Sequence, residues 1–165
     1  MDTTTHSSSH LSWSDTLLTG NIPMDEEHRE FVSIVHALQT CPDDHFAARL
    51  EEFQAHALSH FGSEDRWMVG SEYPQGDCHV DEHRAVLQSV DEVRELIARN
   101  APDGLAVGRR LANELAHWFP AHVQHLDSAL AQWVSQQNTG GKPVVLRRNV
   151  SHPAQMESSG LPPVQ

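Results

Sequence analysis

The sequence predicts an all-α protein, an up-down-up-down four-helix bundle with an irregular N-terminal lead-in and a flexible C-terminal tail. Four long segments carry apolar side chains at the three- and four-residue spacing of one helix face, and short loops containing proline or glycine separate them. The strict alternation typical of a strand is missing from the sequence. Amphipathic helices joined by short loops bury their apolar faces against one another as a bundle. We expect an arm at 1–11, the bundle at 12–137 and the tail at 138–165.

The N-terminal residues divide into an arm and a lead-in. Residues 1–11 are small, polar and unpatterned, which is typical of a disordered arm. The lead-in that follows contains Trp13 and Ile22, and both need an apolar surface against which to pack. We expect the lead-in to act as a lid over one end of the bundle.

The first helix is expected to run from Met24 or Asp25, just after Pro23, to Thr40, where Pro42 ends it. A histidine occupies a core position in its apolar stripe. Considered alone, such a histidine is more often a hydrogen-bonded core residue than a metal ligand. The stripe comprises Met24, His28, Phe31, Val32, Val35 and Leu38.

The second helix is expected at residues 43–70. His60 and Glu64 are four residues apart, about 40° around a helix, so both side chains can reach one centre. A surface His–Glu pair is the alternative, but large apolar residues flank these two positions and indicate a buried face. The inner side carries Phe46, Leu50, Phe53, Ala57, His60, Phe61 and Glu64.

The third helix is expected at residues 77–100, after a loop rich in glycine and proline. Its unbroken stripe starts with His79 and His83, and this spacing of four lets one helix give two imidazoles to one metal. The remaining stripe positions are Val86, Val90, Val93 and Ile97.

The fourth helix is expected at residues 105–137, and it places His122 and Asp127 in an otherwise apolar segment. The two are five residues apart, so on a regular α-helix they point about 140° from each other. Pro120 lacks the N–H that would donate to the carbonyl four residues back. We therefore predict a kink or a π-type bulge between Trp118 and Asp127. The inner face carries Leu111, Leu115, Trp118, His122, Leu126, Ala129 and Trp133.

Composition excludes several classes of function. The chain has 23 acidic and 11 basic residues, and this acidic excess argues against nucleic acid or an anionic membrane as a partner. Neither a secretory signal nor a membrane-spanning run is found, and Cys41 and Cys78 lack metal-site spacing, so we expect a cytoplasmic protein with reduced thiols. Its 13 histidines are roughly three to four times the number that an average usage of about 2% gives, which points to metal.

All four helices offer inward-facing side chains of the metal-ligand type. Five histidines and two carboxylates exceed the needs of one tetrahedral zinc, so two metal ions are the better count. If both carboxylates and one oxygen atom bridge two octahedral ions, one coordination position stays open, which suits a diatomic ligand. Imidazole together with carboxylate favours iron. The residues are His28, His60, Glu64, His79, His83, His122 and Asp127.

The pattern resembles the hemerythrins, specifically the bacterial hemerythrin-like proteins, over about residues 13–134. The matching segments are Trp13-Ser14-Asp15, Gly20-Asn21-Ile22-Pro23-Met24-Asp25-Glu26-Glu27-His28, His60-Phe61-Gly62-Ser63-Glu64-Asp65, His79-Val80-Asp81-Glu82-His83, and Trp118-Phe119-Pro120-Ala121-His122 with Asp127. The resemblance implies a non-haem di-iron site, with a bridging oxo or hydroxo group, that binds O2 or another small diatomic or anion reversibly.

The resemblance also implies a role for each residue of the site. One iron takes three histidines, His79, His83 and His122, and the other takes His28 and His60. Both carboxylates bridge the irons, and Phe61, Trp118, Phe119 and Val123 line the O2 pocket. Phe119 and Val123 stand where the family usually has leucine and isoleucine. Leu130 replaces a tyrosine that is frequent in the family, and Glu27 replaces a frequent glutamine. The O2 affinity and the autoxidation rate of relatives therefore do not transfer to this chain.

Several alternatives stay open at this point. Ferritin-like di-iron proteins need two Glu-x-x-His motifs, whereas Glu114-Leu115-Ala116-His117 is the sole clean match here. A zinc site that includes His56 is disfavoured, and His36, His45, His117 and His125 are also interpreted as structural or surface residues. For function, storage, carriage, delivery or sensing of O2 is the first hypothesis, and a di-iron enzyme that scavenges peroxide or nitric oxide is the alternative.

Overall fold

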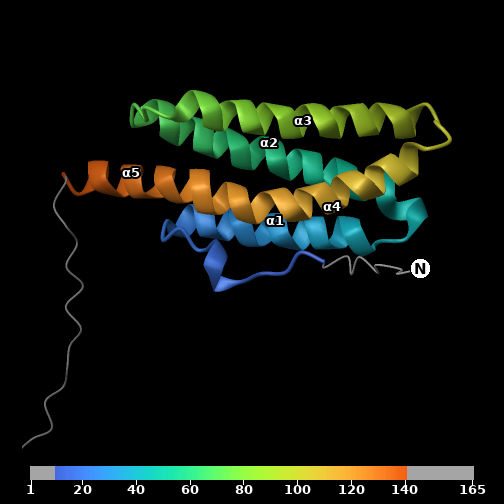
Figure 1. Cartoon of the computed structure of the whole chain (residues 1–165), viewed down its shortest axis with the longest axis horizontal. Helices are drawn as coiled ribbons and strands as arrows, with labels where there is room; N and C mark the ends of the chain where they lie inside the picture. Colours follow the sequence, from blue (N-terminus) through green and yellow to red (C-terminus); the bar gives the residue numbers. More distant parts are fainter. Residues whose placement is uncertain (1–9, 141–165) are drawn as a thin grey trace, which may run out of the picture.

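The protein is an all-helical bundle, as predicted, in a computed structural model that describes residues 10–140 (Figure 1). Its helices are α1 (Ile22–Thr40), α2 (Phe46–Gly70), α3 (Gly76–Ala98), α4 (Gly104–His122) and α5 (Ser128–Asn138). A π-helical segment, Val123–Asp127, joins α4 to α5, so that they form the fourth helix of the bundle. We call this segment the π-turn. Helix α1 packs on α2 and α4, and α3 packs on the same two helices, as in an up-down-up-down bundle.

Helix α1 begins two residues earlier than expected. The Asn21 side chain accepts a hydrogen bond from the Met24 backbone N–H, which caps the helix, and Pro23 lies inside the first turn. Proline is tolerated there because the first N–H groups of a helix have no intrahelical partner. The prediction that the helix starts after Pro23 was therefore wrong. At the other end Cys41 is extended, as expected before Pro42.

The lead-in lies alongside α1 and does not cover an end of the bundle (Figure 1). Leu11 is buried, and its N–H donates to the Gln39 side chain. The Arg29 guanidinium lies 4.5 Å from the ring centre of Trp13. The expectation that Ile22 packs on an apolar surface was wrong, since this first residue of α1 is 71% exposed.

A buried carboxylate fastens the lead-in to the start of α1. Asp25 accepts hydrogen bonds from the Thr19 backbone N–H at 2.7 Å, from the Thr19 hydroxyl at 2.8 Å and from the Gly20 N–H at 3.2 Å. Gly20 has φ +84°, a conformation that suits glycine. These charge-assisted bonds fix the path of the chain just before the helix that carries His28.

The other helix boundaries differ slightly from the prediction. Residues Asp43–His45 form a 3-10 turn before α2. Helix α3 ends at Ala98 rather than Asn100, because Asn100 adopts φ +53° and the Ala101 N–H folds back onto the Leu96 carbonyl. The predicted domain boundaries at 11 and 138 remain predictions, since most of the arm and tail lie outside the described residues.

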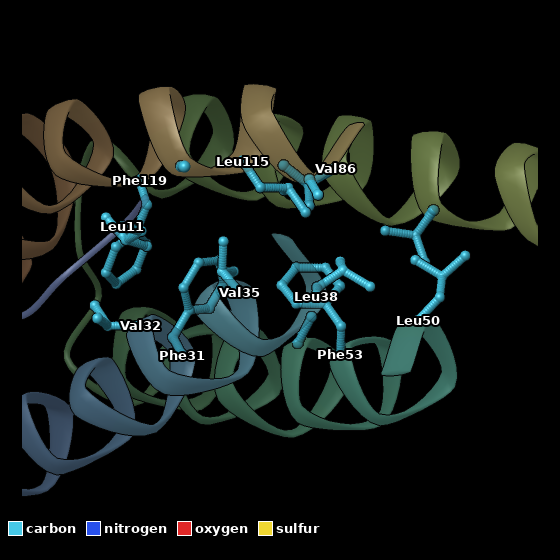
Figure 2. Close-up of a cluster of buried hydrophobic side chains, with 14 of the residues drawn as sticks. Leu11, Phe31, Val32, Val35, Leu38, Leu50, Phe53, Val86, Leu115 and Phe119 are labelled. Atoms are coloured by element: carbon cyan, nitrogen blue, oxygen red, sulfur yellow. The ribbon is translucent and has the colours of Figure 1, made fainter. Parts of the chain in front are cut away.

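The apolar core lies mainly in the half of the bundle that follows His28 along α1, and Figure 2 shows its aromatic and aliphatic side chains. A smaller cluster of Met24, Met68, Leu130 and Ala131 lies toward the other end. On α1, α2 and the fourth helix, the predicted ligands fall between members of the two clusters; on α1, for example, Met24 precedes His28 and Phe31 follows it. Fully burying one large apolar side chain stabilises the fold by roughly 1.5–3 kcal/mol. This packing therefore gives the polar centre a rigid setting.

Within residues 10–140, no helix has the length and apolar character needed to cross a membrane.

Candidate metal centre

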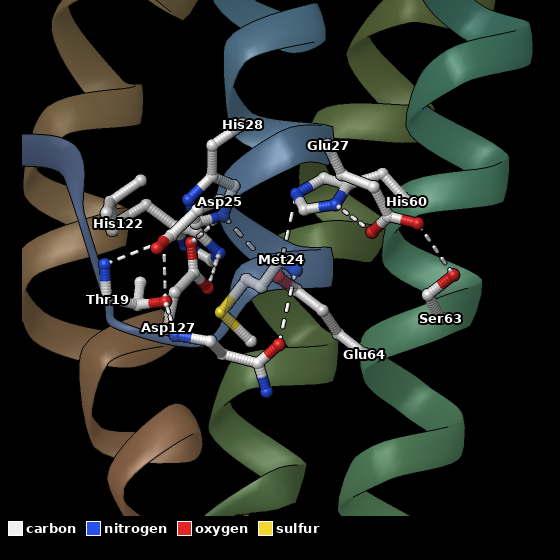
Figure 3. A network of polar contacts seen from close by, with 12 residues as sticks. Thr19, Met24, Asp25, Glu27, His28, His60, Ser63, Glu64, His122 and Asp127 are labelled. Carbon is white, nitrogen blue, oxygen red and sulfur yellow. Dashed lines mark hydrogen bonds and ion pairs between the residues drawn. The ribbon is translucent and has the colours of Figure 1, made fainter.

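Seven polar side chains from all four bundle helices converge between the two apolar clusters. Figure 3 labels His28, His60, Glu64, His122 and Asp127 among them. All seven are residues that the sequence predicts, and each is at most 3% exposed. Buried imidazoles and carboxylates are costly unless hydrogen bonds or a cation satisfy them. The group consists of His28, His60, Glu64, His79, His83, His122 and Asp127.

One side of the centre has three histidines. The Nε2 atoms of His79 and His83 lie 3.1 and 3.2 Å from Nε2 of His122. A carboxylate oxygen of Glu64 lies 3.0 Å from Nε2 of His83, and one of Asp127 lies 3.0 Å from Nε2 of His79. Three nitrogen and two oxygen donors therefore surround one point.

The other side has two histidines. Nε2 of His28 lies 3.1 Å from Asp127 Oδ2 and 3.8 Å from Glu64 Oε1. Nε2 of His60 lies 3.5 Å from the same Glu64 oxygen. This side therefore has one imidazole fewer than the three-histidine side.

Each carboxylate divides its oxygens between the two groups. Glu64 directs Oε2 toward His79 and His83, and Oε1 toward His28 and His60. Asp127 directs Oδ1 toward His79 and His122, and Oδ2 toward His28. This is the arrangement that a carboxylate bridge between two cations requires.

Many metal-donor atoms of the centre are fully buried, yet they have no hydrogen bond to any part of the chain that the structure describes. Leaving such atoms unsatisfied costs about 1–3 kcal/mol each, and more when they are charged. Cations placed between them would satisfy nitrogen and oxygen together, so the residues fit a pair of metal ions. Imidazole nitrogen with carboxylate oxygen suits iron, although zinc and other metals accept imidazole too. The unsatisfied inward atoms are Nε2 of His28 and His60 and both carboxylate oxygens of Glu64 and Asp127.

The ionisation of the centre reflects competition between burial and the two carboxylates. Burial lowers the pKa of His28, but the negative charges of Asp127 and Glu64, with oxygens 3.1 and 3.8 Å from Nε2, outweigh it and raise that pKa to about 9. The pKa of His79 is raised to about 9 for the same reasons. Burial raises the pKa of Glu64 and of Asp127, but the neighbouring histidines hold both below their usual values. Without metal, protons on His28 and His79 therefore supply positive charge that bound cations would otherwise supply.

The π-turn explains how His122 and Asp127 face the same centre, and it confirms the predicted bulge. In it the Ser128 N–H bonds to the carbonyl of Val123, five residues back, and the Ser128 hydroxyl donates to the same oxygen at 2.9 Å. A π-helical turn contains about one residue more than an α-helical turn, so two positions that are five residues apart lie on the same side of the helix. His122 Nε2 and Asp127 Oδ1 lie 3.2 Å apart as a result.

The four predicted pocket residues lie around the ligands in different ways. Phe61 stacks on His83 at 4.0 Å between ring centres, and Phe119 meets His28 edge-on at 5.3 Å. Val123 is fully buried beside His122. Trp118 is half-buried and lies over His122 at 4.2 Å, with its indole N–H donating to Glu82. Phe119 thus contacts the two-histidine side through His28, and Phe61 contacts it through His60, with 5.4 Å between ring centres.

Sequence reasoning assigned no role at the centre to Glu82, and noted Glu27 only as a departure from the family pattern. Glu27 lies 3.0 Å from Nδ1 of His60, and Glu82 lies 2.9 Å from Nδ1 of His122. In the sequence, Glu27 directly precedes the predicted ligand His28, and Glu82 directly precedes His83. That adjacency alone does not show which histidine a glutamate contacts, because the contact is to another helix.

A groove of about 630 Å³ between α2 and α3 reaches the edge of the centre. Phe61 and His83 lie in its wall, and Leu58, which is 55% exposed, lies at its rim. A larger groove of about 1110 Å³ between residues 18–23 and α5 contains none of the seven residues. The smaller groove thus reaches one of the predicted ligands, His83.

The remaining described histidines lie outside both ligand groups. Nδ1 of His36 bonds to the Leu11 carbonyl, and His45, His117 and His125 are exposed. His56 stacks against His60, with 5.8 Å between ring centres, and lies 3.6 Å from Glu30. Cys41 and Cys78 are free thiols.

Comparison with known proteins adds an independent observation. Residues 20–134 match the family model described as "Hemerythrin HHE cation binding domain". A bacteriohemerythrin of Ralstonia nicotianae is 36% identical over 128 residues, covering 77% of this chain and 90% of that protein. Bacteriohemerythrins of Pseudomonas paraeruginosa and Stenotrophomonas maltophilia are 26% and 25% identical, over 80% and 75% of this chain and 92% and 81% of their own lengths.

Proposed function

Because this chain belongs to the hemerythrin family, we propose that it is a non-haem di-iron protein that binds O2 reversibly. One iron is held by His79, His83 and His122, and the other by His28 and His60. Glu64 and Asp127 bridge the two, together with an oxo or hydroxo group. Such a site would serve storage, carriage, delivery or sensing of O2.

The observation that carries the proposal is the division of carboxylate oxygens between two unequal histidine groups. Glu64 and Asp127 each present one oxygen to either side. A mononuclear site has no use for that arrangement, since all its donors would face one point. Two carboxylates with five imidazoles therefore support a binuclear centre.

The inequality of the two groups indicates where a small molecule binds. With both carboxylates bridging, the three-histidine side has five protein donors and the two-histidine side has four. Two six-coordinate ions held by these residues and one bridging oxygen would have one free position, on the two-histidine side. A pair of iron(II) ions would supply the electrons that O2 binding draws upon.

The apolar residues next to the two-histidine side would keep water away from its free coordination position. Phe119 is fully buried, lies against His28 and stacks on Phe31 with ring centres 4.0 Å apart. These rings present apolar surface and no proton donors, so a neutral diatomic is favoured over water or an anion. This environment supports binding rather than turnover.

The test uses the full-length chain reconstituted with iron(II) under nitrogen. We expect two irons per chain, a visible charge-transfer band on addition of O2, and stoichiometric loss of the band and recovery of O2 under vacuum. His122→Ala, which removes a donor from the three-histidine side, should lower iron retention. Uptake of a single zinc in preference to iron would overturn the proposal.

The same preparation distinguishes the enzyme alternative. Peroxide or nitric oxide is supplied with a reductant, and its consumption is followed over time. A scavenging enzyme consumes many equivalents per chain, whereas an O2-binding protein reacts at most to the stoichiometry of its irons. Sustained consumption without reversible O2 release would support the enzyme alternative.

A further inference from the structure

The five histidines of the centre differ in the groups that lie near Nδ1, the ring nitrogen on the side away from the centre. All five direct Nε2 inward, so Nδ1 faces away from the centre. Nδ1 of His60 and of His122 lie 3.0 and 2.9 Å from a glutamate oxygen. Nδ1 of His83 is 3.6 Å from Asp65, which exceeds hydrogen-bond distance, while Nδ1 of His28 and of His79 has no hydrogen-bond partner within residues 10–140.

The three carboxylates follow one pattern along the chain. Glu27 on α1 faces His60 on α2, and Asp65 on α2 faces His83 on α3. Glu82 on α3 faces His122 on α4 in the same way. Each carboxylate also directly adjoins a residue of the centre in the sequence. Since neighbouring residues on a helix point about 100° apart, one faces the metal while the next faces the adjoining helix. Each of these helices therefore presents one or two donors to the centre and one carboxylate to a donor of its neighbour.

The two close contacts define which nitrogen carries the proton. An ionised carboxylate only accepts, so the imidazole Nδ1 donates to it and Nε2 keeps its lone pair for a metal. One Glu82 oxygen lies within hydrogen-bond distance of both His122 Nδ1 and the Trp118 indole N–H, as suits a carboxylate that only accepts. A carboxylate behind an imidazole makes that ligand more basic.

Further contacts hold the two glutamates in place. Glu27 accepts a hydrogen bond from the Ser63 hydroxyl at 3.1 Å, and Figure 3 shows it between His60 and Ser63. Glu82 accepts from the Trp118 indole at 3.2 Å, and Trp118 lies over His122. The side chains of both histidines are fully buried, whereas those of Glu27 and Glu82 are 28% and 48% exposed. The contact from Glu27 is thus less screened by solvent than the one from Glu82.

We propose that Glu27 and Glu82 are positioning residues of the di-iron centre, which fix the Nδ1–H tautomers of His60 and His122 and, through their charge, favour iron(III) over iron(II). This inference rests on the proposed function. The two glutamates act on different sides of the centre, Glu27 behind a ligand of the iron with the free position and Glu82 behind a ligand of the saturated iron. Their removal therefore has separable effects.

Paired substitutions separate charge from orientation. Glu27→Gln and Glu82→Gln keep an oxygen acceptor and remove the charge, while Glu27→Ala and Glu82→Ala remove both. Glu26→Gln on α1 and Glu114→Gln on α4 are matched controls, because both residues are exposed. All variants are made in the full-length chain. Three measurements apply: iron loss to a chelator, the midpoint potential of the iron-loaded protein, and the histidine tautomers of the zinc-loaded protein by 15N NMR.

We expect both glutamine variants to keep the Nδ1–H tautomer, to raise the midpoint potential and to lose iron more readily by roughly 10-fold. The alanine variants should in addition lose the defined tautomer at His60 or His122. Glu27→Gln should change O2 or azide affinity more than Glu82→Gln does, and both controls should match the parent. Potentials and tautomers equal to the parent in all four variants would overturn the positioning role while leaving the proposed function intact. Failure of the parent to bind two irons would overturn the proposed function itself.

Discussion

His122 and Asp127 are five residues apart, yet His122 Nε2 and Asp127 Oδ1 lie only 3.2 Å from each other. The π-turn makes this possible, because the positions would point about 140° apart on a regular α-helix. Asp127 also contacts His28 and His79, so it joins both halves of the centre. The geometry of one helical turn therefore determines whether the two histidine groups share this carboxylate.

Inserting one alanine between Val123 and Gln124 should abolish binding of the second metal. The spacing between the two ligands becomes six, which on this helix rotates Asp127 by a further 100° or so, away from His28. We expect about half the iron content of the parent, measured after reconstitution, with the helical circular dichroism largely retained. An insertion variant that still binds both irons would show that the register of the π-turn is unimportant.

Deleting Gln124 is the matched control. This exposed residue lies inside the π-turn, and its removal leaves His122 and Asp127 four apart on a regular α-helix. At that spacing they lie about 40° apart, so both still face the centre, and the register of α5 is kept. Iron content should match the parent within error, and a loss as large as that of the insertion would contradict this account.

Metal uptake should release protons. The pKa values of His28 and His79 are about 9 without metal, since Asp127 and Glu64 stabilise their charged forms. At pH 7 both rings carry a proton that a metal must displace, so uptake should release about two protons per chain and tighten as pH rises toward 9. Titration of zinc into weakly buffered metal-free protein with a pH indicator measures the release. No release at pH 7 would contradict the assigned protonation.

The metal-free protein should lose stability on both sides of a window near pH 4.5–6.5. The folded pKa of His28 and His79 exceeds the unfolded value of 6.5, so their stabilisation is complete below pH 6.5 and is lost as pH rises to about 9. The pKa values of Glu64 and Asp127 lie below 4.5 and 3.8, so their contribution is lost as pH falls through the acid range. Urea midpoints at pH 6 and 9, in chelator, test the alkaline limb.

Metal-loaded protein is the control for that experiment. Bound cations replace the protons, so its urea midpoint should change little between pH 6 and 9. If the metal-free protein were more stable at pH 9 than at pH 6, the protonated histidines would not be the stabilising species.

The helices were predictable from sequence because apolar spacing and loop residues are local signals. All four segments were assigned with errors of a few residues at their ends, and each error has a local cause. Pro23 is accommodated in the first turn of α1, and Asn100 ends α3 by adopting a left-handed conformation. The π-turn was predictable for a different reason, since two ligands five residues apart are incompatible with a straight α-helix.

The outer contacts were not predictable, because they depend on how neighbouring helices are rotated. Glu27 and Glu82 adjoin His28 and His83 in the sequence but bond to His60 and His122. The path of the lead-in beside α1 is likewise set by long-range contacts, such as that between Trp13 and Arg29. No periodicity within one segment carries this information.

Gly108→Ala should destabilise the fold through helix packing, away from the centre. A Cβ at Gly108 would lie 2.8 Å from Cζ of the fully buried Phe46 ring. Such overpacking costs about 1–3 kcal/mol, more than the roughly 0.5–1 kcal/mol gained by replacing glycine in a helix. Gly62→Ala is the control, since its Cβ would meet only the Arg66 side chain at 3.6 Å. Chemical denaturation should rank Gly62→Ala above the parent and Gly108→Ala below it, and the reverse order would refute the packing.

Phe119→Leu should leave both irons bound and accelerate autoxidation. Phe119 is fully buried between His28 and Phe31, and shortening it opens space beside the two-histidine side, where water can approach. The loss of core volume should also cost about 1–2 kcal/mol of stability. Decay of the oxygenated absorption band in air measures the autoxidation rate, and iron analysis checks that the metal is retained.

Phe53→Leu separates the two effects of that substitution. Phe53 is also fully buried and packs on Phe31, with 5.3 Å between ring centres, but it lies two helical turns before His60 on α2. It should lose similar stability while its autoxidation rate stays at the parent value, because the space opened lies in the apolar core. Equal rates in Phe119→Leu and Phe53→Leu would mean that Phe119 stabilises the core without protecting the iron from water.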